Sequence, residues 1–238
     1  MVYKRFYSVL RQSANRILAG HSCVLCGLPS TDSGICPICK HAVQQNDHAC
    51  YQCGDGITSS ISQQKCGACL KKPKNYRRLI AACHYDFPIN RVISRFKFNR
   101  QLHLGSSLIE LLIDAIKSGY KNQSLPEAII PIPLHHKRLA ERGFNQSALI
   151  AKQINRSLDI PITQQAITRI KNTPHQIGLK AVERRKNLTN AFAIQSELPK
   201  HIALVDDVVT TGTTITEATK VCLKHGAEQV DIWCLAKT

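Results

Sequence analysis

The chain has 238 residues, eleven cysteines and a formal net charge of +16. No apolar run approaches the roughly 20 residues of a transmembrane helix, which excludes a protein anchored by such spans. The N-terminus is basic but lacks the apolar core and cleavage site of a secretory signal, so we expect a cytoplasmic protein. In that reducing compartment the cysteines predict metal binding rather than disulfides. The strong positive charge suits a polyanionic partner.

Residues 1–22 carry four basic and no acidic side chains, and their apolar residues predict a basic N-terminal helix with one apolar stripe: Tyr3, Phe6, Leu10, Ile17 and Leu18. Such a stripe can rest on an anionic membrane surface, here the inner face of the cytoplasmic membrane. More often it packs against its own protein. Both interpretations stay open.

Residues 23–75 contain four C-x-x-C pairs: Cys23/Cys26, Cys36/Cys39, Cys50/Cys53 and Cys66/Cys69. Each pair can point two thiolates at one tetrahedral ion, so two successive pairs complete a closed structural site. The spacing predicts a double zinc ribbon with one or two structural zinc ions. Unliganded thiols and an iron–sulfur cluster are weaker alternatives. The segment has few apolar residues, so metal would supply the stability that a small core lacks.

Residues 76–238 read as alternating strands and helices. Strands are predicted at 79–87, 127–135, 202–207 and 229–236, and helices at 89–98, 104–119, 145–158 and 213–226. This order predicts an α/β domain with a mostly parallel sheet flanked by helices. The remaining cysteines lie in apolar surroundings and are expected in the core: Cys83, Cys222 and Cys234.

The stretch "IALVDDVVTTGTTI" (residues 202–215) places Asp206 and Asp207 directly after four apolar residues, at the end of a buried strand. Ligands of open parallel sheets bind beyond the carboxyl ends of the strands. The backbone N–H groups of the turn and of the next helix attract phosphate, and Gly212 lets the backbone approach closely. Two carboxylates beside a phosphate cradle suit a sugar phosphate, because they accept ribose hydroxyl hydrogens or face its magnesium. No Lys follows Gly212, so the turn is not a P-loop.

This stretch resembles the phosphoribosyl pyrophosphate (PRPP) loop of type I phosphoribosyltransferases. Three further blocks, "PIPLHHKRLAERGFNQ" (131–146), "TPHQIGL" (173–179) and "ERRKN" with "AF" (183–192), resemble the ComF family of competence and DNA-utilisation proteins. That family also places a double zinc ribbon before its transferase-like domain. The resemblance covers the chain from Cys23 onward and implies a type I phosphoribosyltransferase-like sheet in residues 76–238.

Carried over, the resemblance implies a PRPP site that uses magnesium. Asp206 and Asp207 would be the catalytic pair on the ribose hydroxyls, with the 5'-phosphate held by Thr210, Thr211, Gly212, Thr213 and Thr214. Two arginines would meet the pyrophosphate: Arg138 and Arg142. A flexible loop between Lys171 and Asn190 would close over it with Lys180, Arg184 and Arg185.

Residues 71–100 carry nine basic side chains against one acidic, and five of the basic ones are predicted to bind single-stranded DNA: Lys71, Lys72, Lys74, Arg77 and Arg78. Three functions stay open. The first is a PRPP-binding ComF-family factor that acts on single-stranded DNA in natural transformation or DNA utilisation, with competence helicase or channel proteins as partners. The second is a free-standing phosphoribosyltransferase with an unknown acceptor. The third is a zinc-ribbon adaptor without turnover.

Overall fold

The computed structural model describes residues 22–29, 34–43, 49–57, 64–98, 102–171 and 190–238. Residues 1–21 of the predicted basic helix lie outside this part of the chain, as do the predicted loop cations Lys180, Arg184 and Arg185. Those assignments stay predictions. Within the described residues, none of the helices combines the length and the apolar character needed to cross a membrane.

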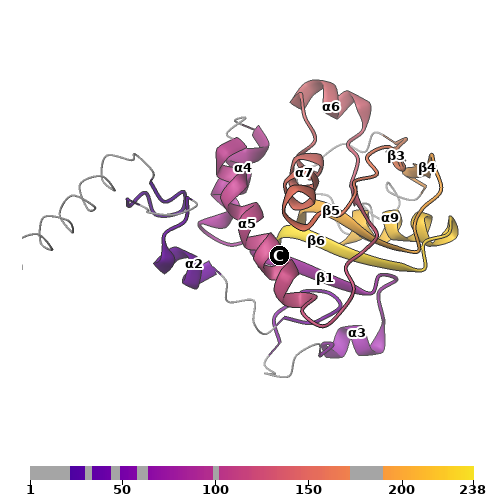
Figure 1. Ribbon diagram of the computed structural model, residues 1–238, viewed down its shortest axis with the longest axis horizontal. Helices are drawn as coiled ribbons and strands as arrows, with labels where there is room; N and C mark the ends of the chain where they lie inside the picture. The colour runs from indigo at the N-terminus through magenta and orange to yellow at the C-terminus, as the bar shows by residue number, and fades with distance from the viewer. Residues whose placement is uncertain (1–21, 30–33, 44–48, 58–63, 99–101, 172–189) are drawn as a thin grey trace, which may run out of the picture.

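Four parallel strands form the main sheet, in the order β1–β6–β5–β2 (Figure 1). They are β1 (Arg78–His84), β2 (Ala128–Pro131), β5 (His201–Val209) and β6 (Gln229–Lys237). β5 is central, with Val205 beside Trp233 of β6 and beside Pro131 of β2. Both faces of these strands are apolar and buried, as parallel sheets require. The predicted parallel α/β sheet is confirmed.

Three helices build the first face of the fold: α4 (Ile89–Phe98), α5 (Leu102–Gly119) and α7 (Gln146–Leu158). α5 and α7 pack on the sheet, and α4 packs on α5 (Figure 1). Their apolar residues recur at helical spacing, so Ile93, Leu112 and Ile154 meet in one fully buried core. This face positions the N-terminus of α7 beside the end of β5.

The second face is covered by α9 (Thr213–Lys224) and by an antiparallel pair, β3 (Ile167–Arg169) with β4 (Phe192–Ile194). Ile215, Ala218 and Cys222 of α9 lie in one core with strand residues of β5 and β6. Cys83, Cys222 and Cys234 are all buried, which confirms the core role predicted for them.

Helix α6 (His136–Arg142) and the β3–β4 pair were not predicted, and the strand predicted at 127–135 ends at Pro131. α6 buries no residue and therefore shows no apolar period. Local capping bounds it instead. His135 Nδ1 accepts a hydrogen bond of 3.3 Å from the Lys137 N–H, and Gly143 ends the helix with φ of 81°.

The two cysteine-rich segments attach at different places. The first contains α2 (Pro37–Val43), and its Ile35 belongs to the core around α5. The second contains α3 (Gly67–Lys71) and lies where the chain enters β1, since Leu79 N–H donates to the Tyr51 carbonyl oxygen at 3.2 Å. Gly54 fits there because its φ is 75° and a Cβ would come within 2.6 Å of the Leu79 side chain.

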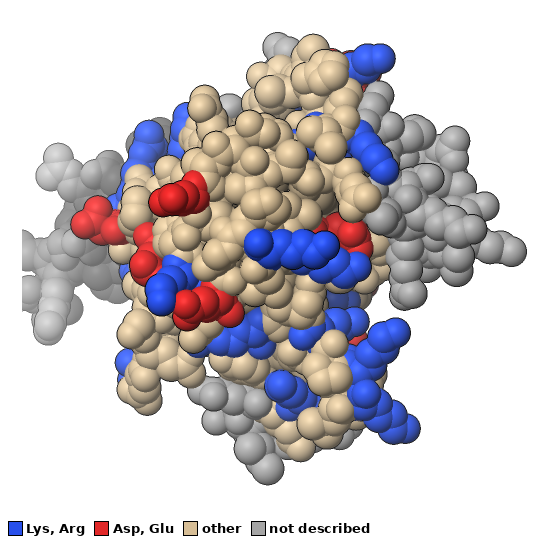
Figure 2. Space-filling view, turned by 90° about the vertical axis from the view of Figure 1, so that its right-hand side faces the viewer, with Lys and Arg blue, Asp and Glu red and all other residues tan. Residues whose placement is uncertain are grey.

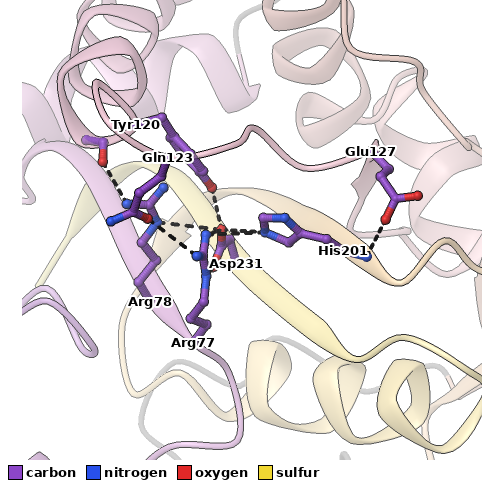
Figure 3. A network of polar contacts seen from close by, with 8 residues as sticks. Arg77, Arg78, Tyr120, Gln123, Glu127, His201 and Asp231 are labelled. Atoms are coloured by element: carbon purple, nitrogen blue, oxygen red, sulfur yellow. Dashed lines mark hydrogen bonds and ion pairs between the residues drawn. The ribbon is translucent and has the colours of Figure 1, made fainter.

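A buried polar network joins β1, β5 and β6 around the carboxylate of Asp231, which is 0% exposed (Figure 3). Arg77 Nε donates to Asp231 Oδ1 at 2.8 Å, and Tyr120 Oη donates to Oδ2. His201 Nε2 lies 2.9 Å from the same Oδ2 atom. The guanidinium of Arg78 stacks on the Tyr120 ring at 3.4 Å. Burial alone would raise the pKa of Asp231, but its bonds to Arg77, His201 and Tyr120 hold that pKa well below the ordinary value.

Replacing Asp231 with Asn should lower the free energy of unfolding by about 3–5 kcal/mol at pH 7, because Arg78 is then left buried without its counter-charge. A carboxyl with a lowered folded pKa stabilises the fold above its unfolded pKa, about 3.9, and loses that effect as pH falls through the folded value. The free energy of unfolding, measured with urea, should therefore fall less steeply from pH 7 to pH 3 in Asp231→Asn than in the wild type.

The matched control is Glu228→Gln, which breaks the exposed pair with Lys200 and should leave the unfolding midpoint unchanged. Equal midpoints for Asp231→Asn and Glu228→Gln would show that the network does not stabilise the fold.

Candidate functional site

The turn from β5 into α9 has the geometry of an anion-binding site. β5 ends at Val209, and Gly212 adopts φ of 71° at the residue before α9. Gly212 makes no side-chain cap at the start of α9, so this residue leaves the first N–H groups of the helix without a side-chain acceptor. Thr210 and Thr211 are exposed, and the Thr211 and Thr213 hydroxyls lie 2.9 Å apart. Thr214 is half-buried in the first turn of α9.

Asp206 and Asp207 lie together at the carboxyl end of β5, where the sequence placed them. Asp206 Oδ1 accepts from the Ser147 hydroxyl at 3.1 Å and from the Asp207 N–H at 2.9 Å. Burial and the neighbouring Asp207 charge raise the pKa of Asp206 to about 7. Asp207 is 9% exposed and has a different partner, the Lys97 ammonium at 2.9 Å from its Oδ1 atom.

Sequence reasoning missed Ser147 and Lys97 at this pair. Ser147 is the second residue of α7, and Asn145 positions it by accepting a hydrogen bond of 3.0 Å from the Ser147 N–H. Lys97 comes from α4, far away in the sequence. In the sequence it reads as one more lysine in a basic helix, so only the tertiary structure reveals its contact with Asp207.

The two arginines assigned to pyrophosphate lie on α6. Arg138 is half-buried, and burial together with the charge of Arg142 lowers its pKa. Arg142 Nη1 donates to Gln146 Oε1 at 2.9 Å. Arg169 of β3 was not singled out from the sequence. Burial is the main cause of its lowered pKa; the charge of Arg138 lowers that pKa further, and the charge of Asp206 opposes the shift. Arg138 of α6 and Arg169 of β3 are thus electrostatic neighbours, and Arg169 brings positive charge toward Asp206.

The predicted DNA-binding group divides in the structure. Lys71, Lys72 and Lys74 are exposed near α3. Figure 2 draws the face that lies on the right in Figure 1, and Lys and Arg side chains gather on its lower half. Arg78, by contrast, is 2% exposed and lies beside Asp231, and Arg77 donates to the same carboxylate. The guanidinium groups of both arginines are therefore engaged with Asp231, and the three lysines are the exposed members of the group.

Both groups of four cysteines could hold a metal ion. In each group, Cys23/Cys26/Cys36/Cys39 and Cys50/Cys53/Cys66/Cys69, the four sulfurs lie within 4.8 Å of one another. The Sγ atoms of Cys26 and Cys36 are 3.8 Å apart, and those of Cys53 and Cys66 3.7 Å. A tetrahedral ion with metal–sulfur bonds of about 2.3 Å needs sulfur–sulfur edges of about 3.8 Å.

One thiol in each group is already favoured in the form that a metal binds. Burial opposes ionisation of Cys23 and Cys50, yet backbone N–H donors bring the pKa of Cys23 to about 6 and that of Cys50 to about 7. A metal binds the thiolate form, which such donors stabilise. The sequential pairing expected from the spacing is the pairing that the structure brings together.

The second cysteine group borders the turn from β5 into α9 directly. A hollow of about 220 Å³ lies between them, and residues of both segments line it: Cys53, Asp55, Lys74, Tyr76, Val209, Thr210, Thr211, Gly212 and Lys237. Lys237 Nζ bridges to Asp55 Oδ1 at 2.7 Å, and Asn75 Nδ2 donates to the Thr216 carbonyl oxygen of α9 at 2.9 Å. This second cysteine group is therefore part of the wall of the candidate site.

No protein-family model matches the chain. Among solved structures, a purine phosphoribosyltransferase from Pyrococcus horikoshii is similar with 22% identity and a TM-score of 0.34, over 55% of this chain and 70% of that one. An orotate phosphoribosyltransferase from Aeropyrum pernix is similar with 16% identity and a TM-score of 0.36, over 59% and 75% of the two chains.

Curated proteins match over most of their length. Competence protein F of Haemophilus influenzae is 38% identical over 223 residues, which cover 90% of this chain and 96% of that protein. DNA utilization protein YhgH of Escherichia coli K12 is 37% identical over 91% and 96% of the two chains. Competence protein ComFC of Streptococcus pneumoniae is 26% identical over 90% and 99%. The chain belongs to the ComF/YhgH family of competence and DNA-utilisation proteins.

Proposed function

We propose that this protein binds PRPP at the turn between β5 and α9 and acts with single-stranded DNA during its uptake or utilisation. The observation that carries the proposal is the pair Asp206–Asp207 near the carboxyl end of β5, followed by the turn that contains the left-handed Gly212 and leads into α9. The relatives' names, competence protein and DNA utilization protein, support the biological role.

The ligand would lie across the carboxyl end of β5. Its 5'-phosphate would accept hydrogen bonds from the N–H groups of Thr211, Gly212 and Thr213, helped by the hydroxyls of Thr210 and Thr214 and by the α9 dipole. The ribose hydroxyls would donate to Asp206 and Asp207. Arg138 and Arg142, with their guanidinium groups on α6, are the cations available for the pyrophosphate, and magnesium would accompany it.

If PRPP is a substrate, the same groups support transfer of its ribose. Departure of pyrophosphate leaves an oxocarbenium-like sugar, which the carboxylates stabilise, while the arginines stabilise the leaving group. The acceptor is a nucleophile that this site does not identify. An adaptor that uses only its cysteine groups would have no need for the acidic pair.

Replacing both aspartates, Asp206→Asn with Asp207→Asn, should weaken PRPP binding at least about tenfold, since neutral amides are poorer hydrogen-bond acceptors than carboxylates. Isothermal titration of PRPP with magnesium measures this, and a repeat with single-stranded DNA present tests coupling between the two ligands. Asp114→Asn, which only breaks the surface pair with Lys40, is the control and should bind as the wild type does. Equal affinity in the double variant would overturn the site.

We also propose that Lys71, Lys72 and Lys74 contact DNA phosphates. Their triple replacement by Ala should weaken binding of a single-stranded oligonucleotide without sequence preference and reduce the slope of log affinity against log salt by up to about 2, at about 0.7 for each lost phosphate contact. Fluorescence anisotropy at several salt concentrations measures the slope. Three exposed lysines elsewhere serve as the matched control: Lys121, Lys152 and Lys224. The same loss in both triple variants would mean that no particular DNA surface exists.

Each cysteine group, we infer, holds one structural zinc ion. Elemental analysis should give two zinc ions per wild-type chain and about one in either Cys26→Ser or Cys53→Ser. Because the second group borders the turn from β5 into α9, Cys53→Ser should weaken PRPP binding severalfold, whereas Cys26→Ser should not. Wild-type affinity in a zinc-depleted Cys53→Ser variant would refute this link between metal and ligand.

A further inference from the structure

Lys97 is the cationic partner of Asp207, and it comes from outside the motifs of the sequence. Its Nζ atom lies 2.9 Å from Asp207 Oδ1, and the two side chains are only 19% and 12% exposed. The contact joins α4 to the end of β5, two elements on different layers of the fold. A lysine that loses this much water does so at a cost in free energy unless its charge is matched. Asp207 supplies that match.

The structure also holds Lys97 through its backbone. Gln146, 1% exposed, donates from Nε2 to the Lys97 carbonyl oxygen at 3.3 Å, and Arg142 donates to the Oε1 atom of Gln146. The neighbouring Phe96 lies against Phe144 with ring centroids 6.4 Å apart. The end of α4 is thus fixed on the block that carries the site's arginines, and Lys97 is positioned beside Asp207 before any ligand arrives.

The Phe96 ring further limits how α4 can move. It packs so closely on α5 that a Cβ at Gly105 would come within 2.6 Å of it. The backbone of Lys97 therefore cannot move away from β5 unless the end of α4 leaves both Phe144 and α5. The ammonium therefore belongs to the site as much as the carboxylates do.

We propose that Lys97 is the resident counter-ion of Asp207 and makes binding of the sugar 5'-phosphate part of the ligand independent of magnesium. This inference rests on the proposed function. The Lys97 ammonium lies against Asp207 Oδ1, and a divalent cation on the same oxygen would be strongly repelled by it. Asp207 keeps lone pairs for a ribose hydroxyl, and the nearby positive charge favours an anionic ligand. Magnesium would then be needed only by the pyrophosphate.

Ribose 5-phosphate is the diagnostic probe, because it carries the sugar and the phosphate but no pyrophosphate. Calorimetric titrations would use magnesium-free buffer rather than a chelator, since a chelator would also strip zinc. For the wild type, the dissociation constants of ribose 5-phosphate measured with and without magnesium should agree within about twofold. Lys97→Met should bind it at least about tenfold more weakly without magnesium and recover part of that loss when magnesium is added, because the cation then takes the vacated place.

Two further variants separate charge from structure. Lys97→Arg keeps the charge and should keep the magnesium-independent affinity. Lys220→Met removes a lysine that is paired with Glu217 at 2.7 Å on α9, and it should behave as the wild type does. Thermal unfolding of every variant shows whether it is folded, and Lys97→Gln, which also lacks the charge, takes the place of Lys97→Met if that variant is not.

The outcomes distinguish this inference from the proposed function. Wild-type binding of ribose 5-phosphate that depends on magnesium, or undiminished affinity in folded Lys97→Met, would overturn the role of Lys97 and leave the PRPP site standing. A wild type that binds neither ribose 5-phosphate nor PRPP would overturn both.

Discussion

The position of β5 between β6 and β2 determines where this protein can do chemistry. A parallel strand with neighbours on both sides and apolar cover on both faces can expose polar side chains only at its ends. At the carboxyl end of β5 the chain places Asp206 and Asp207, and the turn to α9 follows at once. At the amino end of the sheet lies the Asp231 network, which ties β1 to β5 and β6. One end is held together by matched charge, and the other is open to a ligand.

The two cysteine groups contribute differently because they attach to different parts of this frame. The first packs with the core around α5, and Lys40 of α2 pairs with Asp114 of α5 at the surface. The second borders the Thr210–Gly212 turn and holds the entry to β1 through Gln52, whose amide donates to the carbonyl oxygens of Lys74 and Tyr76. A metal in the second group would therefore stabilise the wall of the ligand site as well as its own segment.

Charge is distributed so that the basic surface and the acidic pair serve one purpose. The net charge of +16 attracts polyanions, and the exposed lysines near α3 are where we propose that such a partner binds. Within this surface, Asp206 and Asp207 remain compatible with an anionic ligand because Lys97 matches the second carboxylate, and burial with the neighbouring charge raises the pKa of the first. The arginines of α6 and β3 add positive charge at the rim.

Sequence by itself determined the elements whose signal is local: the C-x-x-C pairs, the alternating strands and helices, and the acidic pair with its glycine turn. Each depends on spacing along the chain, which directly sets where thiolates, apolar faces and backbone N–H groups point. Only the tertiary structure decided which distant residues meet. In the tertiary structure Arg78 lies buried beside Asp231, Lys97 contacts Asp207, and the second cysteine group borders the turn from β5 into α9. These contacts depend on how the helices pack on the sheet. The sequence does not show whether a lysine or arginine faces water or a buried carboxylate.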